Sequence, residues 1–222
     1  MRINAPNELE LLYTRCMMGF LLFHPTPSHI LMIGLGGGSL AKFVYHKILQ
    51  TKTIVVEINQ QVVNVARDYF ALPSEDDRFQ IIIADGAEYI TNYLTSVDVL
   101  MVDGFDEDCQ VASLCSQEFY DQAHRVLRND GVLVLNLLSC DKNLNNYLQR
   151  VWDSFQGHVI TMLSEVRGNL IVFAFKQNHG KLTCKKLKDR ANKLAESYGL
   201  PFPDFVFKLR KYSGKHSDYV EI

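Results

Sequence analysis

The sequence predicts an α/β fold built on a doubly wound, mostly parallel sheet of seven strands that finishes in an antiparallel hairpin. Three observations predict it. Short apolar segments alternate with amphipathic segments from residue 30 to about residue 155, which is typical of strands joined by crossover helices. The first apolar segment breaks into glycines that open a helix. The last two apolar segments flank Arg167-Gly168-Asn169, a tight turn that predicts a hairpin.

The elements follow in order. Strands are expected at residues 30–33, 53–57, 79–83, 97–102, 132–138, 159–163 and 170–175. Helices are expected at residues 39–49, after Asn59, from residue 86 to about 93, and at residues 116–127, 142–155 and 182–197. Asn59 and Ser116 have the side chains of helix N-caps. Asn129-Asp130-Gly131 predicts a turn, and the polar residues 105–114 predict a loop at an active site. A parallel sheet completed by a hairpin is the layout of class I methyltransferase-like Rossmann folds.

Composition limits the function classes. The chain has 222 residues, 47% of them hydrophobic and 22% charged, which is enough for one large core. We expect an N-terminal segment at residues 1–29, a cofactor-binding domain at 30–178 and a helical extension at 179–222. No apolar run approaches the roughly 20 residues of a membrane span, so we expect no membrane partner and a cytoplasmic location.

Metal and nucleic-acid binding are not expected either. The five cysteines are scattered and show no metal-ligand spacing, which is typical of reduced thiols. Lysine and arginine outnumber acidic residues only after residue 175. The basic residues there are dispersed, with few aromatic residues among them, so we interpret them as a solvated helix face.

Polar or small residues follow four of the predicted strands, where parallel sheets bind ligands. Glycines follow the first strand, a carboxylate follows each of the next three, and together they are Gly34, Gly36, Gly37, Gly38, Glu57, Asp85 and Asp103. Glycines let the backbone approach a nucleotide-like group closely, and Glu57 can accept hydrogen bonds from a ribose diol. Asp85 can accept from an adenine amino group. A glycine turn followed by an acidic residue is also typical of an NAD-dependent dehydrogenase, but Asp85-Gly86 and Asp103 suit an adenosyl group better than a dinucleotide.

Seven short stretches give a more specific indication. In these stretches the chain resembles the spermidine synthase family, the polyamine aminopropyltransferases. They are Tyr13-Thr-Arg15, Ile33-Gly-Leu-Gly-Gly-Gly-Ser39, Val55-Val-Glu57, Ala84-Asp-Gly86, Val102-Asp-Gly-Phe-Asp106, Ser116-Gln-Glu-Phe-Tyr120 and Gly131-Val-Leu-Val134.

The resemblance implies a transferase that uses S-adenosylmethionine or its decarboxylated form and moves an aminopropyl or methyl group to an amine. It implies that Glu57 binds the ribose and that Asp85 and Gly86 bind the adenine. It further implies that Asp103 is the catalytic base and that Asp106 helps to hold the amine substrate. Tyr13 and Arg15 are also expected to bind substrate. No metal is implied, and a homodimer is expected.

Three departures from the family pattern are visible. Gly37 stands where family members carry an aspartate, and Arg15 stands where they carry an acidic residue. Only about thirty residues precede the first strand, so the family's amino-terminal β domain is not expected. Because a carboxylate is replaced and a cation gained, one hypothesis is a preference for intact S-adenosylmethionine. The alternatives are an Arg15 that pairs with Glu8 or Glu10, and a nucleoside-binding domain or dimer partner without turnover.

Overall fold

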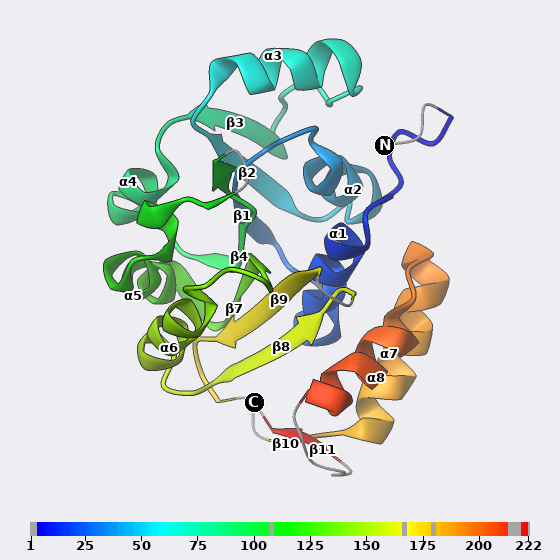
Figure 1. The fold of residues 1–222 in the computed structure, drawn as a ribbon. Helices are drawn as coiled ribbons and strands as arrows, with labels where there is room; N and C mark the ends of the chain where they lie inside the picture. The colour runs from blue at the N-terminus through cyan, green and yellow to red at the C-terminus, as the bar shows by residue number, and fades with distance from the viewer. Residues whose placement is uncertain (1–3, 107–108, 166–167, 179–180, 213–218, 222) are drawn as a thin grey trace.

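Seven strands of the computed structural model form one mixed sheet in the order β3-β2-β1-β4-β7-β9-β8 (Figure 1). The structure describes all residues except 1–3, 107–108, 166–167, 179–180, 213–218 and 222. The five strands β3, β2, β1, β4 and β7 are parallel, whereas β9 runs antiparallel to both of its neighbours. The predicted fold class, including the terminal hairpin, is therefore confirmed.

The strands of this sheet are β1 (His29–Ile33), β2 (Lys52–Glu57), β3 (Phe79–Ile83), β4 (Val97–Val102), β7 (Leu127–Leu138), β8 (Val159–Leu163) and β9 (Asn169–Phe175). Two further pairs lie outside it, β5 (Phe105–Asp106) with β6 (Cys109–Gln110), and β10 (Lys181–Thr183) with β11 (Tyr219–Glu221).

Helices cover both faces of the sheet because alternate strand residues point to opposite sides. Ile30 and Met32 belong to one core cluster, and Leu31 and Ile33 belong to the other. The first face is covered by α1 (Leu12–Met17), η1 (Met18–Leu22), α2 (Ser39–Lys47), α3 (Gln60–Tyr69), α7 (Cys184–Tyr198) and α8 (Phe202–Tyr212). The second is covered by α4 (Gly86–Thr91), α5 (Gln117–Val126) and α6 (Leu144–Ser154), with η2 (Ala112–Cys115) beside them.

Local capping signals from the sequence have the expected partners. The Asn59 side chain accepts from the Gln61 amide, and Ser116 accepts from the Phe119 amide, so both N-caps are confirmed. The predicted turn at residues 129–131 is not a separate turn. It lies in an irregular part of β7, because Val97 pairs with Leu127 and Val99 pairs with Val132. The predicted loop at residues 105–114 is also more ordered than expected, since it contains β5, β6 and η2.

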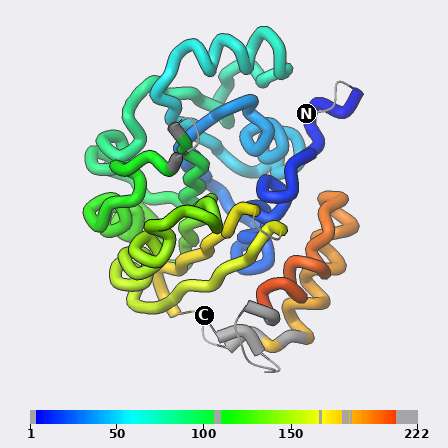
Figure 2. The backbone as a smooth tube through the Cα atoms, viewed as in Figure 1, coloured from blue at the N-terminus to red at the C-terminus, as the bar shows by residue number. Residues whose placement is uncertain are grey.

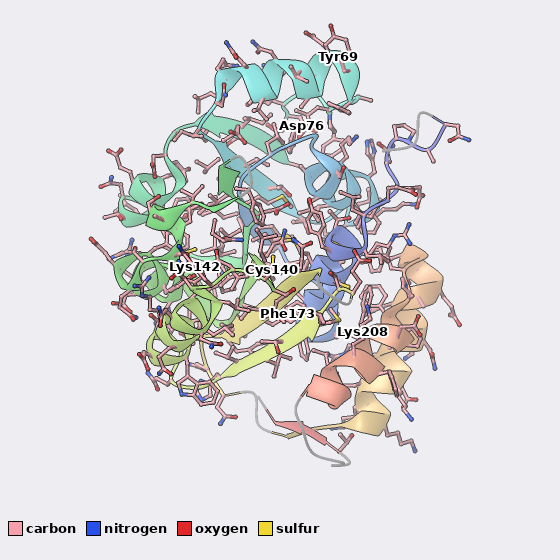
Figure 3. All side chains as sticks on the ribbon, in the orientation of Figure 1. Tyr69, Asp76, Cys140, Lys142, Phe173 and Lys208 are labelled. Carbon is pink, nitrogen blue, oxygen red and sulfur yellow. The ribbon has the colours of Figure 1, made fainter. Side chains whose placement is uncertain are left out.

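The C-terminal helices return to the start of the chain. The helices α7 and α8 lie next to one another (Figures 1 and 2), and both contact η1. The Arg190 guanidinium on α7 donates to the Leu22 carbonyl, and Lys208 Nζ on α8 donates to the Ser164 carbonyl at 2.6 Å. Figure 3 labels Lys208 and also Phe173, a wholly buried core residue of β9. The predicted boundaries at residues 29 and 178 stay predictions. Within the described residues, no helix is both long enough and apolar enough to span a membrane.

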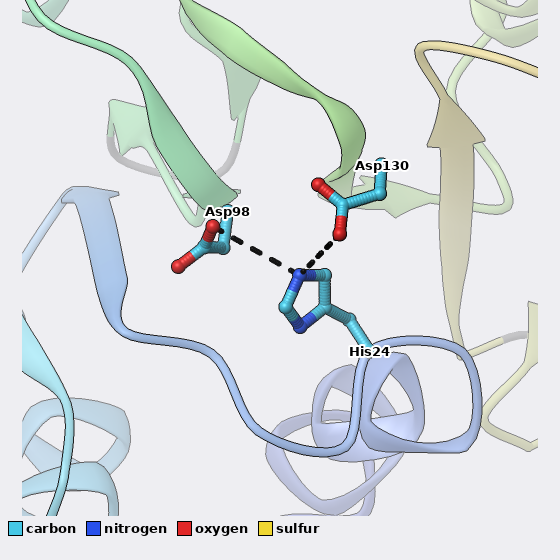
Figure 4. Close-up of side chains that lie close together, drawn as sticks. All are labelled: His24, Asp98 and Asp130. Carbon is cyan, nitrogen blue, oxygen red and sulfur yellow. Dashed lines mark ion pairs between the residues drawn. The ribbon is translucent and has the colours of Figure 1, made fainter.

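A charged cluster fixes the opposite edge of the sheet, where the strands begin. Asp98 is buried, and its Oδ2 accepts from the Ser28 amide and hydroxyl and from the His29 amide, all within 2.8 Å. Its Oδ1 accepts from Arg128 Nη1 at 2.7 Å. His24 Nε2 lies 3.9 Å from Asp98 Oδ1 and 3.5 Å from Asp130 Oδ2 (Figure 4). These three side chains lie within reach of one shared cation, but both oxygens of Asp98 already accept protein donors.

The hydrogen bonds to Asp98 set its charge. Burial alone would raise the pKa of Asp98, but the donors of Ser28, His29 and Arg128 outweigh burial and hold it below its usual range. The contribution of Asp98 to stability is therefore present above its unfolded-state pKa of about 3.9 and is lost as pH falls through its lower folded-state pKa.

We expect Asp98→Asn to lower the free energy of unfolding by about 3 kcal/mol at pH 7, because hydrogen bonds to a buried charge are lost. The difference from the wild type should shrink as pH falls below about 4, because Asp98 of the unfolded wild-type chain then takes up a proton that the folded chain binds only at lower pH. Urea unfolding at pH 7 and pH 3 measures both effects. The control is Asp130→Asn, whose side chain is 68% exposed and should cost little. Equal losses in the two variants would contradict this account.

Candidate functional site

The parallel register brings the predicted site residues to one edge of the sheet. Ile33, the last residue of β1, pairs with Val56 of β2 and with Val102 of β4. Gly34, Glu57 and Asp103 come next along these strands, so they leave the sheet at the same level. Glu57 also pairs with Ile83 at the end of β3, which places Asp85 nearby.

A cavity of about 650 Å³ lies at this edge. Its volume is within the usual range for sites that hold a nucleoside-sized ligand. The predicted site residues that line it are Tyr13, Gly34, Gly36, Gly37, Glu57, Asp85, Gly86 and Asp103. Apolar side chains of Leu11, Ile58 and Val62 complete part of the wall. The cavity can therefore enclose a flat apolar ring and still present carboxylates to polar groups.

Glu57 is held in place by the backbone. Its side chain is buried, Oε2 accepts from the Leu35 amide at 2.9 Å, and Oε1 accepts from the Asn59 amide at 2.9 Å. A carboxylate can accept about four hydrogen bonds, so two acceptor positions remain. Both oxygens can therefore still accept the two hydroxyl groups of a diol.

Asp85 is the N-cap of α4. Its Oδ1 accepts from the Ala87 amide at 2.7 Å and from the Glu88 amide at 3.2 Å. Within the described part of the chain, Oδ2 accepts no hydrogen bond. The cap thus fixes the carboxylate and leaves one oxygen to a donor in the cavity.

Asp103 lies between two hydrogen-bond donors. Asn136 Nδ2 donates to Asp103 Oδ1 at 2.7 Å, and the Tyr13 hydroxyl also donates to this carboxylate. Burial raises the pKa of Asp103 above its usual value, and the two hydrogen bonds partly oppose that rise. Burial and the charge of Asp103 raise the pKa of Tyr13 well above its usual value, so the phenol remains protonated.

Sequence reasoning missed Asn136. It is 2% exposed and lies near the carboxyl end of β7, beside β4. The signal that could have revealed it is a polar residue inside the apolar run at residues 132–138. A buried amide of this kind needs a partner, because burying it without a hydrogen bond costs about 1–3 kcal/mol.

The four predicted glycines differ in what they do. Gly34 has φ +94°, and a Cβ there would lie 2.3 Å from the Asp103 carbonyl oxygen. Gly36 and Gly37 line the cavity, and a Cβ at Gly37 would meet the Phe70 ring only at 3.7 Å. Gly38 is not among the residues described as lining the cavity. It has φ +70° and precedes α2, where a Cβ would lie 2.6 Å from Leu72 Cδ1.

Two predicted substrate residues are placed differently. Arg15 does not line the cavity among the described residues, and its Nε donates to the Leu9 carbonyl at 2.5 Å. The structure therefore does not bring Arg15 to the glycine turn. Asp106 belongs to β5, but its side chain is outside the part of the chain that the structure describes.

We expect Gly34→Ala to destabilise the fold by more than about 3 kcal/mol, because a methyl group would strike the Asp103 carbonyl in a left-handed conformation. The matched control is Gly199→Ala, with φ +68° and open space around the added carbon. That variant should cost only about 1–2 kcal/mol from its backbone conformation. Thermal and urea unfolding compare the two, and equal losses would show that the contact between β1 and β4 is unimportant.

Comparison with known proteins agrees with this geometry. The family model described as the spermine/spermidine synthase domain matches residues 10–186. A polyamine aminopropyltransferase of Chromobacterium violaceum is 40% identical over 211 residues, covering 95% of this chain and 81% of the relative. A protein of the same name from Neisseria meningitidis serogroup A is 40% identical over 220 residues, covering 97% and 84%.

Solved structures share the fold. Human methyltransferase-like protein 13 in complex with SAH superposes with a TM-score of 0.77 at 26% identity, covering 86% of this chain and 94% of that chain. Spermidine synthase from Thermotoga maritima gives a TM-score of 0.68 at 24% identity, covering 89% of this chain and 70% of that chain. The predicted resemblance is confirmed over most of the sequence: the chain belongs to the spermine/spermidine synthase family and is a transferase.

Proposed function

We propose that this protein transfers an aminopropyl group from decarboxylated S-adenosylmethionine to the primary amine of a polyamine. The observation that carries the proposal is Asp103, a carboxylate held between Tyr13 and Asn136 in the same cavity as Glu57 and Asp85. Relatives that are 40% identical over almost the whole chain and are named polyamine aminopropyltransferases support the choice of group. A dehydrogenase and a domain without turnover are not favoured by these relatives.

The cavity fits an adenosyl group. Glu57 would accept the two ribose hydroxyls, and the open oxygen of Asp85 would accept from the adenine amino group. Gly34 and Gly36 let the backbone approach the ligand. Gly86 packs on Ile33 beside the proposed adenine site. When bound, the sulfonium supplies a carbon activated for displacement, with a neutral thioether as leaving group.

The role of the protein's own residues is to orient and deprotonate the acceptor amine. A primary alkylamine is protonated near neutral pH and has no lone pair with which to attack. The Asp103 carboxylate would bind this ammonium, orient it and take one proton as the nitrogen–carbon bond forms. Tyr13, which stays protonated, would keep the carboxylate in place through its hydrogen bond. Asp106 and the two residues that follow it in the sequence, Glu107 and Asp108, would attract a second ammonium group of the acceptor.

A second candidate is transfer of a methyl group from intact S-adenosylmethionine. Within the described lining of the cavity, the carboxylates are Glu57, Asp85 and Asp103, and none belongs to the glycine turn. Gly37 has room for a side chain but offers no negative charge to an aminopropyl ammonium. The position of Arg15 gives no support to either donor. The proposed homodimer and the cytoplasmic location are further expectations of the same assignment.

We expect Asp103→Asn to lower kcat/KM by roughly 10²- to 10⁴-fold, because general-base catalysis is lost. Binding of methylthioadenosine should change less than about threefold, since Asp103 faces the amine rather than the nucleoside. Glu57→Gln, in contrast, should weaken the binding of the nucleoside, which calorimetry measures. Retention of full activity by Asp103→Asn would exclude this residue as the base.

The donor can be identified by calorimetry with the two forms of the cofactor. Gly37→Asp should improve the affinity for decarboxylated S-adenosylmethionine relative to the intact form by about tenfold, or about 1.4 kcal/mol, because its carboxylate would attract the aminopropyl ammonium and repel the carboxylate that only the intact form carries. Gly37→Asn is the neutral control of the same size and should leave the ratio unchanged. The product that the wild type forms from its tighter ligand, aminopropylated or methylated amine, decides between the two transfers.

A further inference from the structure

We infer that Asn136 is a positioning residue for Asp103, which fixes one carboxylate oxygen so that the other is presented to the acceptor amine. The inference deepens the proposed function and rests on it. Asn136 lies on β7 and Asp103 directly after β4, and the two strands are paired in parallel. The contact joins residues from neighbouring strands at the edge where the cavity opens.

The geometry of the contact is that of a strong hydrogen bond. Asn136 Nδ2 lies 2.7 Å from Asp103 Oδ1, shorter than most amide–carboxylate bonds. A flipped amide would direct its oxygen at the ionised carboxylate, so the charge on Asp103 dictates which end of Asn136 faces it. The Asn136 side chain is 2% exposed, which shields this bond from competing water.

Asn136 is itself anchored from a second direction. Its backbone carbonyl accepts from Gln110 Nε2 at 3.1 Å, and Gln110 belongs to β6 in the hairpin that follows Asp103. Gln110 Oε1 also lies 3.8 Å from the Cys115 sulfur, which ties the hairpin to η2. Asn136, which donates to Asp103, is thus connected to the β5–β6 hairpin, where we propose that the amine binds.

The cost of this arrangement points to a role beyond packing. Asn136 Oδ1 is buried and has no hydrogen-bond partner in the described chain. An orphaned buried acceptor costs about 1–3 kcal/mol, and an apolar residue of similar size would avoid that cost on a strand that is otherwise apolar. The neutral amide holds the carboxylate and leaves its charge uncompensated. A paired lysine or arginine would neutralise it.

The inference has a distinctive consequence for ionisation. Asn136 donates to the charged form of Asp103 and therefore favours it, so removal of the amide should raise the pKa of Asp103 further. Tyr13 is the titratable group that contacts Asp103 within the described residues, and it remains protonated. Loss of Asn136 should consequently move the acid limb of the pH profile toward higher pH.

The test compares Asn136→Leu and Asn136→Ala with the more conservative Asn136→Gln. We expect the first two to lower kcat by about 10- to 100-fold, to move the acid limb upward by about one pH unit, and to leave methylthioadenosine affinity within about twofold. Asn136→Gln should recover part of the lost kcat and show a smaller shift of the acid limb. Thr53→Val is the matched control, since it removes another buried polar side chain from the sheet, at a residue that does not line this cavity.

A second readout does not require turnover. Titration of the Asp103 carboxyl carbon by NMR, assigned with Asp103→Asn, should show the same upward movement in Asn136→Leu and none in Thr53→Val. Folded Asn136 variants that leave both this titration and the pH profile unchanged would overturn the inference. If wild-type protein transfers no group from either donor, the proposed function fails, and the NMR titration alone then decides whether Asn136 sets the ionisation of Asp103.

Discussion

The in-register pairing of β1 with β2 and β4 is the constraint on which the rest of the site depends. The Gly34 amide donates to the Val56 carbonyl, and the Asp103 amide donates to the Ile33 carbonyl, both at 2.9 Å. These bonds extend the ladder one residue past each strand, so glycine, glutamate and aspartate emerge at one level. Because the Asp103 carbonyl occupies the space of a Cβ at Gly34, the glycine is a condition of this pairing.

The carboxylates of the two sheet edges are stabilised in different ways. At the carboxyl edge, Glu57 is held by backbone amides, Asp85 by the start of α4, and Asp103 by Asn136 and Tyr13. All of these donors are neutral, so none of the three carboxylates is in an ion pair with them. At the amino edge, Asp98 forms an ion pair with the Arg128 guanidinium, so its charge is neutralised within the fold. The partner of each carboxylate therefore separates a proposed functional acid from a structural one.

The C-terminal helices have a structural connection to the site. Tyr13, which contacts Asp103, lies on α1, and α1 continues directly into η1. The α7 helix packs against η1, and its Arg190 binds the Leu22 carbonyl at the end of η1. Lys208 on α8 likewise binds a carbonyl that follows β8. The basic residues of this region were interpreted from the sequence as a solvated face, yet two of them bind backbone carbonyls, one at the end of η1 and one directly after β8.

The sequence by itself determined the α/β class, the antiparallel hairpin, the N-caps at Asn59 and Ser116, and the four strand ends that meet at one edge. Each of these follows from local periodicity, turn chemistry or the rule that parallel strands end on the same side. Tertiary structure alone decided that Asn136 contacts Asp103, that Arg15 binds the Leu9 carbonyl, and that Gly38 packs against Leu72. It also decided the irregular pairing of β7 with β4. A step of two residues along β4, from Val97 to Val99, corresponds to a step of five residues along β7, from Leu127 to Val132. Asn136 and Asp103 are 33 residues apart, and no local pattern specifies which side chain of a neighbouring strand will meet another.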